Sequence, residues 1–220
     1  MFKFLSPVDT VSSLALLVLA IFGLIELAVA LKHSYYSSRR HLIILRVNPQ
    51  LVVGKIGDFV RSIKPPFTFE VAIHYLGTEV NYYVILPRKR VRELVAREGI
   101  SEADDYNLFH HGGEHQGAYL KGGEACPAVD VDKIDFSKVN EIGEGVVIQM
   151  IFGRKRGRKL LANFRILVSA PSSYQAKEIL AAIKPSFPGL NLIESRGDDF
   201  INRVNFREYD AKQSTCWDPA

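Results

Sequence analysis

Cysteine is scarce in this chain of 220 residues, which holds only Cys126 and Cys216. Two cysteines cannot form the framework of a disulfide-rich domain, and free thiols in a reducing compartment are the simpler interpretation. The sequence also lacks the phosphate-binding pattern G-x-x-x-x-G-K-[ST], the nucleophile pattern G-x-S-x-G and any C-x-x-C pair. No catalytic residue and no cofactor is indicated, so we expect a protein that is not an enzyme.

Apolar residues, in contrast, are concentrated near the N-terminus. Residues 11–31 contain one ionisable side chain, Glu26. A helix of this length would reach about 31 Å, close to the thickness of the hydrocarbon core of a bilayer. We therefore predict an extracytoplasmic N-terminus over 1–10, a transmembrane helix over 11–31 and a basic juxtamembrane linker over 32–41.

The charges that follow this run predict its orientation. Four cations and no acid lie between residues 32 and 46: Lys32, Arg39, Arg40 and Arg46. Short flanks rich in Lys and Arg stay in the cytoplasm. We expect a single-pass protein of the inner membrane with its N-terminus outside and its C-terminal region in the cytoplasm. A cleaved signal peptide, with Ala28 and Ala30 at its cleavage site, is the alternative.

Hydrophobic periodicity predicts the fold of the next segment. Apolar and polar residues alternate over 67–75 and 80–86, which is typical of two strands joined as a hairpin. A strand over 41–47 and a helix over 52–63 precede them, and a helix over 87–95 and a strand near 103–107 follow. This order is that of a ferredoxin-like unit, which we place at 42–109.

A similar order recurs later in the chain. Strands over 146–152 and 164–168 precede a helix with Ser172 as its N-cap and Gln175 at the capping-box position, and a strand over 191–194 follows. We predict a second ferredoxin-like unit at 132–206, after a connector at 110–131 and before a tail at 207–220. The expected fold class is α+β, with an N-terminal transmembrane helix and two tandem ferredoxin-like units. Recurrence of a common motif without duplication would give the same pattern.

The formal net charge of +4 conceals a strong separation of charge. Residues 98–144 hold eleven acids and three bases, so the rest of the chain carries +12. Six cations and no acid occur between residues 154 and 165: Arg154, Lys155, Arg156, Arg158, Lys159 and Arg165. The first five are our candidate contacts for nucleic acid or lipid phosphates. A contact with protein or a solvated basic turn would explain the same charges.

A second candidate site is a run of histidines. His110, His111, Glu114 and His115 place four potential metal ligands within six residues. A closed zinc site needs four ligands in tetrahedral geometry, and two glycines separate these side chains. We therefore expect solvated loop histidines and no metal; adventitious metal binding, or a membrane-associated enzyme that uses this loop, is the alternative.

The order of motifs resembles a known family. The segments that carry the resemblance are FEVAIH at 69–74, YYVILPR at 82–88, DDYNLF at 104–109, EGVVIQM at 144–150 and FRILVSAP at 164–171. They are similar to the membrane-proximal N-terminal region of bacterial type IV secretion-like, conjugative-transfer ATPases. The resemblance covers about 42–206. It does not extend to ATP hydrolysis, because the phosphate-binding loop of that family is missing.

The resemblance gives the expected function. It implies a membrane-anchored, non-enzymatic assembly or docking module of a type IV secretion-like or conjugative DNA-transfer system. Its partners would be the transfer ATPase or further copies of the chain, and the chain would be an accessory protein or the front part of a split ATPase gene. The alternative is a membrane-tethered nucleic-acid-binding protein that uses the basic hairpin at 154–165. Neither function involves a small-molecule substrate.

Overall fold

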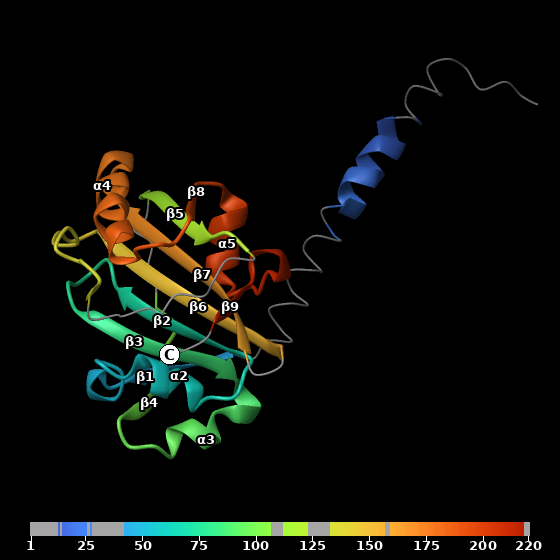
Figure 1. Cartoon of the computed structure of the whole chain (residues 1–220). Coiled ribbons are helices and arrows are strands. Elements are labelled where there is room, and N and C mark those ends of the chain that lie inside the picture. The colour runs from blue at the N-terminus through green and yellow to red at the C-terminus, as the bar shows by residue number, and fades with distance from the viewer. Residues whose placement is uncertain are drawn as a thin grey trace, which may run out of the picture. The chain divides into compact units, whose positions relative to one another are not determined.

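Figure 1 shows a computed structural model of the chain. The structure describes residues 13, 15–25, 27, 42–106, 112–122, 133–156 and 159–217, and of 154–156 and 159 only the backbone. The chain forms two compact units, residues 1–41 and 42–220.

The first unit is helical over 15–25. Among the described residues, no helix is both long enough and apolar enough to span a membrane. The prediction of a transmembrane helix over 11–31 is therefore contradicted, and so is the single-pass location in the inner membrane that followed from it.

The second unit contains the strands. Its first half comprises β1 (Leu42–Val47), η1 (Pro49–Leu51), α2 (Ile56–Arg61), β2 (Phe67–Ile73), β3 (Val80–Pro87), η2 (Arg88–Arg90), α3 (Arg92–Val95) and β4 (Ile100–Ala103). Its second half comprises β5 (Glu114–Leu120), β6 (Gly145–Arg156), β7 (Lys159–Ala170), α4 (Ser173–Ile183), η4 (Lys184–Ser186), β8 (Leu192–Ser195), α5 (Asp198–Asn205), η5 (Ala211–Gln213) and β9 (Thr215–Trp217).

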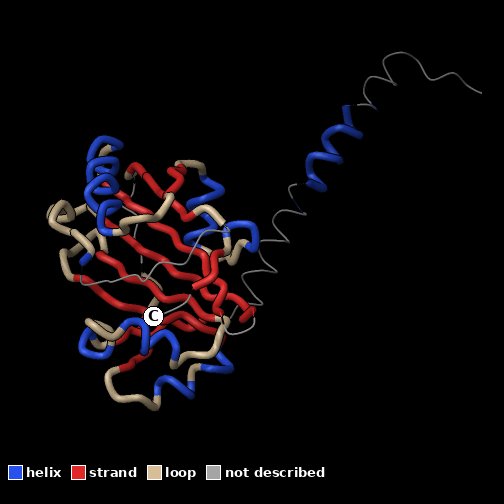
Figure 2. Tube along the Cα trace, viewed as in Figure 1, coloured by secondary structure: helices blue, strands red, loops and turns tan. Residues whose placement is uncertain are grey.

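All nine of these strands belong to one antiparallel sheet (Figure 2). Eight follow the order β4-β1-β3-β2-β6-β7-β5-β8, and β9 pairs with β7. The prediction of two tandem ferredoxin-like units after a transmembrane helix is wrong. The reason is the pairing of β2 with β6, which runs from Phe67↔Phe152 to Ile73↔Val146 and joins both halves into a continuous sheet.

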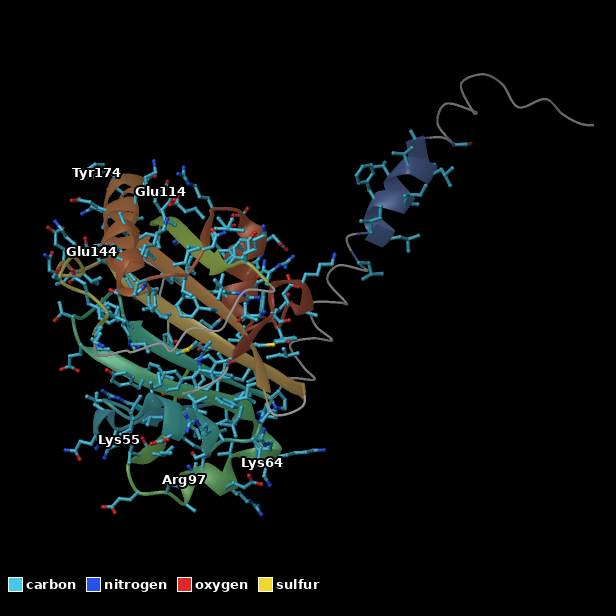
Figure 3. All side chains as sticks on the ribbon, in the orientation of Figure 1. Lys55, Lys64, Arg97, Glu114, Glu144 and Tyr174 are labelled. Atoms are coloured by element: carbon cyan, nitrogen blue, oxygen red, sulfur yellow. The ribbon has the colours of Figure 1, made fainter. Side chains whose placement is uncertain are left out.

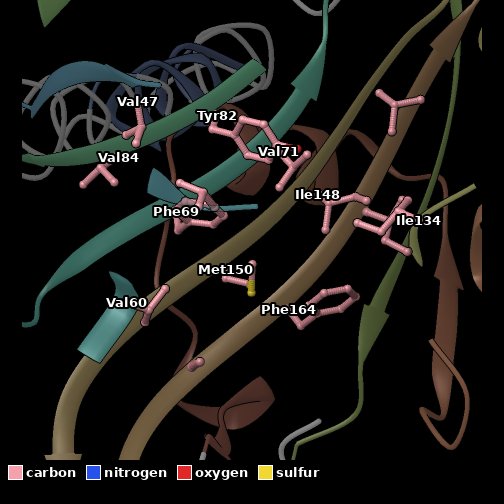
Figure 4. Packing of buried hydrophobic residues seen from close by; sticks show 14 of the residues in the cluster. Val47, Val60, Phe69, Val71, Tyr82, Val84, Ile134, Ile148, Met150 and Phe164 are labelled. Atoms are coloured by element: carbon pink, nitrogen blue, oxygen red, sulfur yellow. The ribbon is translucent and has the colours of Figure 1, made fainter. Parts of the chain in front are cut away.

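One face of the sheet, which we call the first face, carries the larger hydrophobic core (Figure 4). Phe69 and Val71 on β2, Ile148 and Met150 on β6, and Phe164 on β7 point to this face and are almost completely buried. Side chains of α2, α3 and α4 pack against them: Phe59, Val60, Leu94, Ile179 and Leu180. Burying each such side chain contributes roughly 1.5–3 kcal/mol to folding.

The helix α4 begins where its sequence predicts. Ser172 is the N-cap, and its hydroxyl accepts a hydrogen bond from the Gln175 backbone N–H at 3.3 Å. Ala176, Ile179, Leu180 and Ile183 are its buried residues. Their spacing gives the helix one apolar side, which lies on the sheet.

The second face of the sheet is covered by residues near the C-terminus. Phe200 and Val204 of α5 pack on Ala72, Val147 and Leu167, which belong to β2, β6 and β7. This smaller core contains few apolar residues from the sheet, because many of the side chains that point to this face are polar.

Candidate functional site

A row of polar side chains crosses the second face of the sheet. Strand register places Tyr83 beside Glu70, Glu70 beside Gln149, and Gln149 beside Arg165. Glu70, Gln149 and Arg165 are almost completely buried. Buried charges and amides are costly unless they are hydrogen-bonded, so the partners of this row indicate what it does.

Glu70 is held by the segment that follows α5. Arg207 Nε lies 3.0 Å from Glu70 Oε1, and Arg207 Nη2 lies 3.4 Å from Glu70 Oε2 and 3.1 Å from Asp105 Oδ1. Burial alone would lower the pKa of Arg207, but the negative charges of Glu70 and Asp105 and the hydrogen bond to Glu70 raise it above its usual value. The Tyr106 hydroxyl donates to Glu70, and burial raises the pKa of that hydroxyl.

Aromatic rings extend this cluster toward the surface. Tyr106 stacks on His74 and Tyr83, with ring centroids 4.7 and 4.5 Å away, and Tyr83 Oη lies 2.9 Å from His74 Nε2. Burial, together with the nearby Arg46, lowers the pKa of His74. His74 is therefore neutral at pH 7, and its hydrogen bond to Tyr83 helps to hold the stacked rings together.

Gln149 and Arg165 bind the C-terminal end of α5. Gln149 Nε2 donates to Glu70 Oε1 at 2.7 Å and to the Val204 carbonyl at 3.0 Å, and Arg165 Nη1 donates to the Arg203 carbonyl at 3.0 Å. The last carbonyls of a helix lack partners within it, and a cation there is favourable. Burial and the charge of Arg203 lower the pKa of Arg165 to about 10, which leaves it protonated at neutral pH.

The remainder of the C-terminal segment, residues 198–217, is held by side-chain hydrogen bonds and by aromatic rings that pack closely on glycines. Asn163 exchanges two hydrogen bonds with the Asp210 backbone, at 2.7 and 2.8 Å. Phe200 and Tyr209 lie so close to Gly117 and Gly153 that a Cβ atom at either glycine would overlap the ring. The polar row on the second face therefore attaches residues 198–217 to the sheet.

The candidate basic residues lie on the longest hairpin of the sheet. Arg154, Lys155 and Arg156 belong to β6 and Lys159 to β7, while Arg158 lies outside the described residues. The backbone pairs Lys155↔Leu160 and Arg156↔Lys159 continue the ladder past a register shift after Phe152. Arg165, which follows them in the same run of cations but is not one of the five candidate contacts, is buried under α5.

The candidate histidines are only partly described. His115 lies on β5 and is half-buried, and burial lowers its pKa, whereas His110 and His111 fall outside the described residues. Within the described part of the chain, no group of three or more side chains is placed to bind a metal ion.

A feature that the sequence analysis missed lies at one end of the sheet. Leu76 in the β2–β3 turn, Ile142 before β6 and Tyr174 at the start of α4 are 69%, 80% and 73% exposed. We call these three residues the apical patch. Their segments are linked: the Gly143 N–H donates to the Tyr75 carbonyl at 2.7 Å, and Gln175 Nε2 donates to Glu141 Oε2 at 3.3 Å.

Three acidic side chains lie at the same end of the sheet as the apical patch. Glu79, Glu114 and Glu141 are exposed at the same end of the sheet, and we call them the acidic rim. Figure 3 shows Glu114 and Tyr174 at this end, together with Glu144. Glu144, in contrast, is buried, and its carboxylate accepts hydrogen bonds from the backbone N–H groups of Asn140 and Glu141 at 3.0 and 3.1 Å. One signal in the sequence was available: an apolar residue inside each of two turns, at Leu76 and Ile142.

Comparison with known proteins gave no match, so any proposal for the function rests on the fold and on the surfaces described above. No protein-family model, no curated protein and no solved structure matches the chain.

Proposed function

We propose that this protein is a non-enzymatic docking module that binds another protein through its apical patch. The observation that carries the proposal is the exposure of Leu76, Ile142 and Tyr174, each more than two thirds exposed, at one end of the sheet. Exposed apolar side chains that gather with a polar rim mark interaction surfaces. Burying such side chains against a partner removes apolar surface from water and favours binding.

The setting of the patch supports this proposal. Its residues lie in turns and at a helix start, but each of these segments is anchored to the sheet. Gly143 is bound to Tyr75, and Ser172 caps α4. A surface whose backbone is fixed in advance loses little conformational entropy on binding.

The resemblance to conjugative-transfer ATPases suggests where such a module acts. We propose that the module belongs to a type IV secretion-like or DNA-transfer apparatus, with the ATPase of that apparatus or another copy of this chain as its partner. Its contribution would be to position these components.

Photo-crosslinking in cells tests the docking proposal. A photoreactive amino acid replaces Ile142 in the full chain, and a control chain carries it at Glu93, an exposed residue of α3. We expect a discrete protein adduct from position 142 and much less from position 93. The Tyr174→Ser change should reduce the adduct from position 142 several-fold. Equal adduct yields from both positions would contradict the proposal.

The extended hairpin favours a second candidate function, nucleic-acid binding. Two-stranded ribbons fit the major groove of DNA, and cations on them neutralise phosphates without reading sequence. β6 and β7 continue as a paired ribbon at Lys155↔Leu160 and Arg156↔Lys159, and this part of the chain carries five cations within six residues.

Salt-dependent DNA binding tests this second function. Each phosphate contact adds about 0.9 to the slope of log affinity against log salt concentration. We expect the triple change of Arg154, Arg156 and Arg158 to alanine to reduce the slope by about 2 to 3. The matched control removes three exposed cations elsewhere, Arg88, Lys89 and Arg92. If the two triple variants give the same curves, the hairpin does not bind DNA.

A further inference from the structure

We propose that residues 198–207 form a cover over the second face of the sheet, which opens while the sheet stays folded and which Arg207 latches. The cover consists of α5 and the two residues after it, and α5 lies against β5 and β7 (Figure 1). Opening would uncover the row of Glu70, Gln149 and Arg165, a polar surface distinct from the apical patch. This movement does not depend on docking through the apical patch.

The cover buries few apolar side chains. Phe200 and Val204 are the buried residues of α5. On the first face, α4 buries four residues and begins at the cap that Ser172 provides. A segment held by few buried apolar contacts opens at a lower free energy than the core around it. α5 should therefore leave the sheet more readily than α4.

The closed cover also leaves polar atoms without partners. Arg165 Nη1 donates to the Arg203 carbonyl, but Arg165 Nε and Nη2 are buried and have no hydrogen-bond partner among the described residues. Gln149 Nε2 donates to Glu70 and to the Val204 carbonyl, whereas Gln149 Oε1 is buried and likewise has no partner there. A polar atom buried without a partner is unfavourable, and water satisfies it once it is exposed. Hydration of these atoms therefore offsets part of the cost of opening.

Arg207 opposes the opening. Its φ is 52°, in the left-handed region, which residues other than glycine adopt only where their surroundings hold them. Its side chain is 10% exposed, with Nε 3.0 Å from Glu70 Oε1 and Nη2 3.1 Å from Asp105 Oδ1. Glu70 lies on β2 and Asp105 follows β4, so these ion pairs fasten the end of the cover to the other half of the sheet. Breaking them frees both the guanidinium and the strained backbone of the turn.

The chain on either side of the cover confines the movement. Gly197 precedes α5, and a glycine can absorb the changes in φ and ψ that a hinge requires. After the cover, Asn163 exchanges two hydrogen bonds with the Asp210 backbone, and β9 pairs with β7. Arg203, which pairs with Asp210 at 2.6 Å, links the cover to this fixed part. The chain beyond the cover thus stays on the sheet while the cover opens.

Thiol labelling of the native protein tests the cover. The full chain carries Cys126→Ser and Cys216→Ser, and a single new cysteine replaces either Leu167 or Ile166. Both are almost completely buried neighbours on β7, but Leu167 packs under α5 on the second face and Ile166 packs in the core of the first face. We expect a thiol reagent to label Leu167→Cys at least about 100-fold faster than Ile166→Cys, because only the first needs the cover alone to open. Low urea should change the faster rate little, since this opening exposes little surface.

Two further changes separate the cover from the sheet. Arg207→Gly removes the guanidinium but keeps a residue that adopts a φ of 52° without strain, so its effect reports the lost ion pairs. It should speed the labelling of Leu167→Cys at least about tenfold. Ile148→Val weakens the first-face core and should speed the labelling of Ile166→Cys only, because the open and closed forms lose the same contacts. Circular dichroism checks that each variant is folded.

Each outcome decides one part of the inference. Equal labelling rates at positions 166 and 167, or an equal response of both to Ile148→Val, would mean that α5 leaves only when the sheet unfolds, which overturns the cover. If Arg207→Gly leaves the rate at position 167 unchanged, Arg207 is not the latch. Neither result bears on photo-crosslinking from position 142, so the docking proposal stands or fails separately.

Discussion

At the scale of single residues, glycine determines how closely the C-terminal segment approaches the sheet. Gly117 lies on β5 opposite Leu167, and the ring of Phe200 occupies the place where a side chain would stand. Glycine in a strand often marks such a close approach. The sequence around Gly117 gives no sign of this, because Phe200 lies more than eighty residues away in the chain.

The Gly117→Ala change should therefore destabilise the protein. Its Cβ would overlap the Phe200 ring, and such overpacking costs about 1–3 kcal/mol. Gly77→Ala is the control, since no atom lies within 4 Å of a Cβ at that position. Urea denaturation measures both. Phe200→Ala should remove most of the additional cost of Gly117→Ala, because residues in contact are not additive. Equal stabilities of the two glycine variants would contradict the close contact.

At the scale of elements, local patterns predicted most strands and one helix start well. Alternating residues in β2, β3, β6 and β7 identified these strands, and Ser172 was confirmed as the N-cap of α4. Other elements have weaker local signals. The helix predicted over 52–63 is the shorter α2 after a turn of η1, and α5 was not predicted.

The candidate surfaces were predicted less well, because they depend on contacts between distant residues. The polar alternation of β2 and β7 does not reveal that another segment covers Glu70 and Arg165. Arg165 belongs to the same run of cations in the sequence as the five candidate contacts, but in the structure its guanidinium binds the Arg203 carbonyl. Leu76 and Ile142 lie at the same end of the sheet because β2 and β6 are neighbours, and that pairing was not predicted.

At the scale of the whole molecule, two kinds of contact connect the halves of the sheet. β2 and β6 form a ladder of seven register pairs, and on the second face Arg207 binds Glu70, which lies in the other half. A buried polar network of this kind is sensitive to the loss of one member. The halves should therefore unfold together, whereas two tandem units could unfold separately.

Denaturation with two probes tests this cooperativity. Trp217, the one tryptophan of the chain, is buried in β9 and reports on the C-terminal part of the sheet, while far-ultraviolet circular dichroism reports on the whole unit. We expect coincident urea transitions.

The Glu70→Gln change should shift both transitions by the same amount. The expected loss of stability is about 3 kcal/mol, because the change leaves the largely buried Arg207 without its main counter-charge. Asp58→Asn removes an exposed ion pair with Arg61 and should change stability by less than about 0.5 kcal/mol. A shift in circular dichroism without one in Trp217 fluorescence would mean that the two halves fold independently.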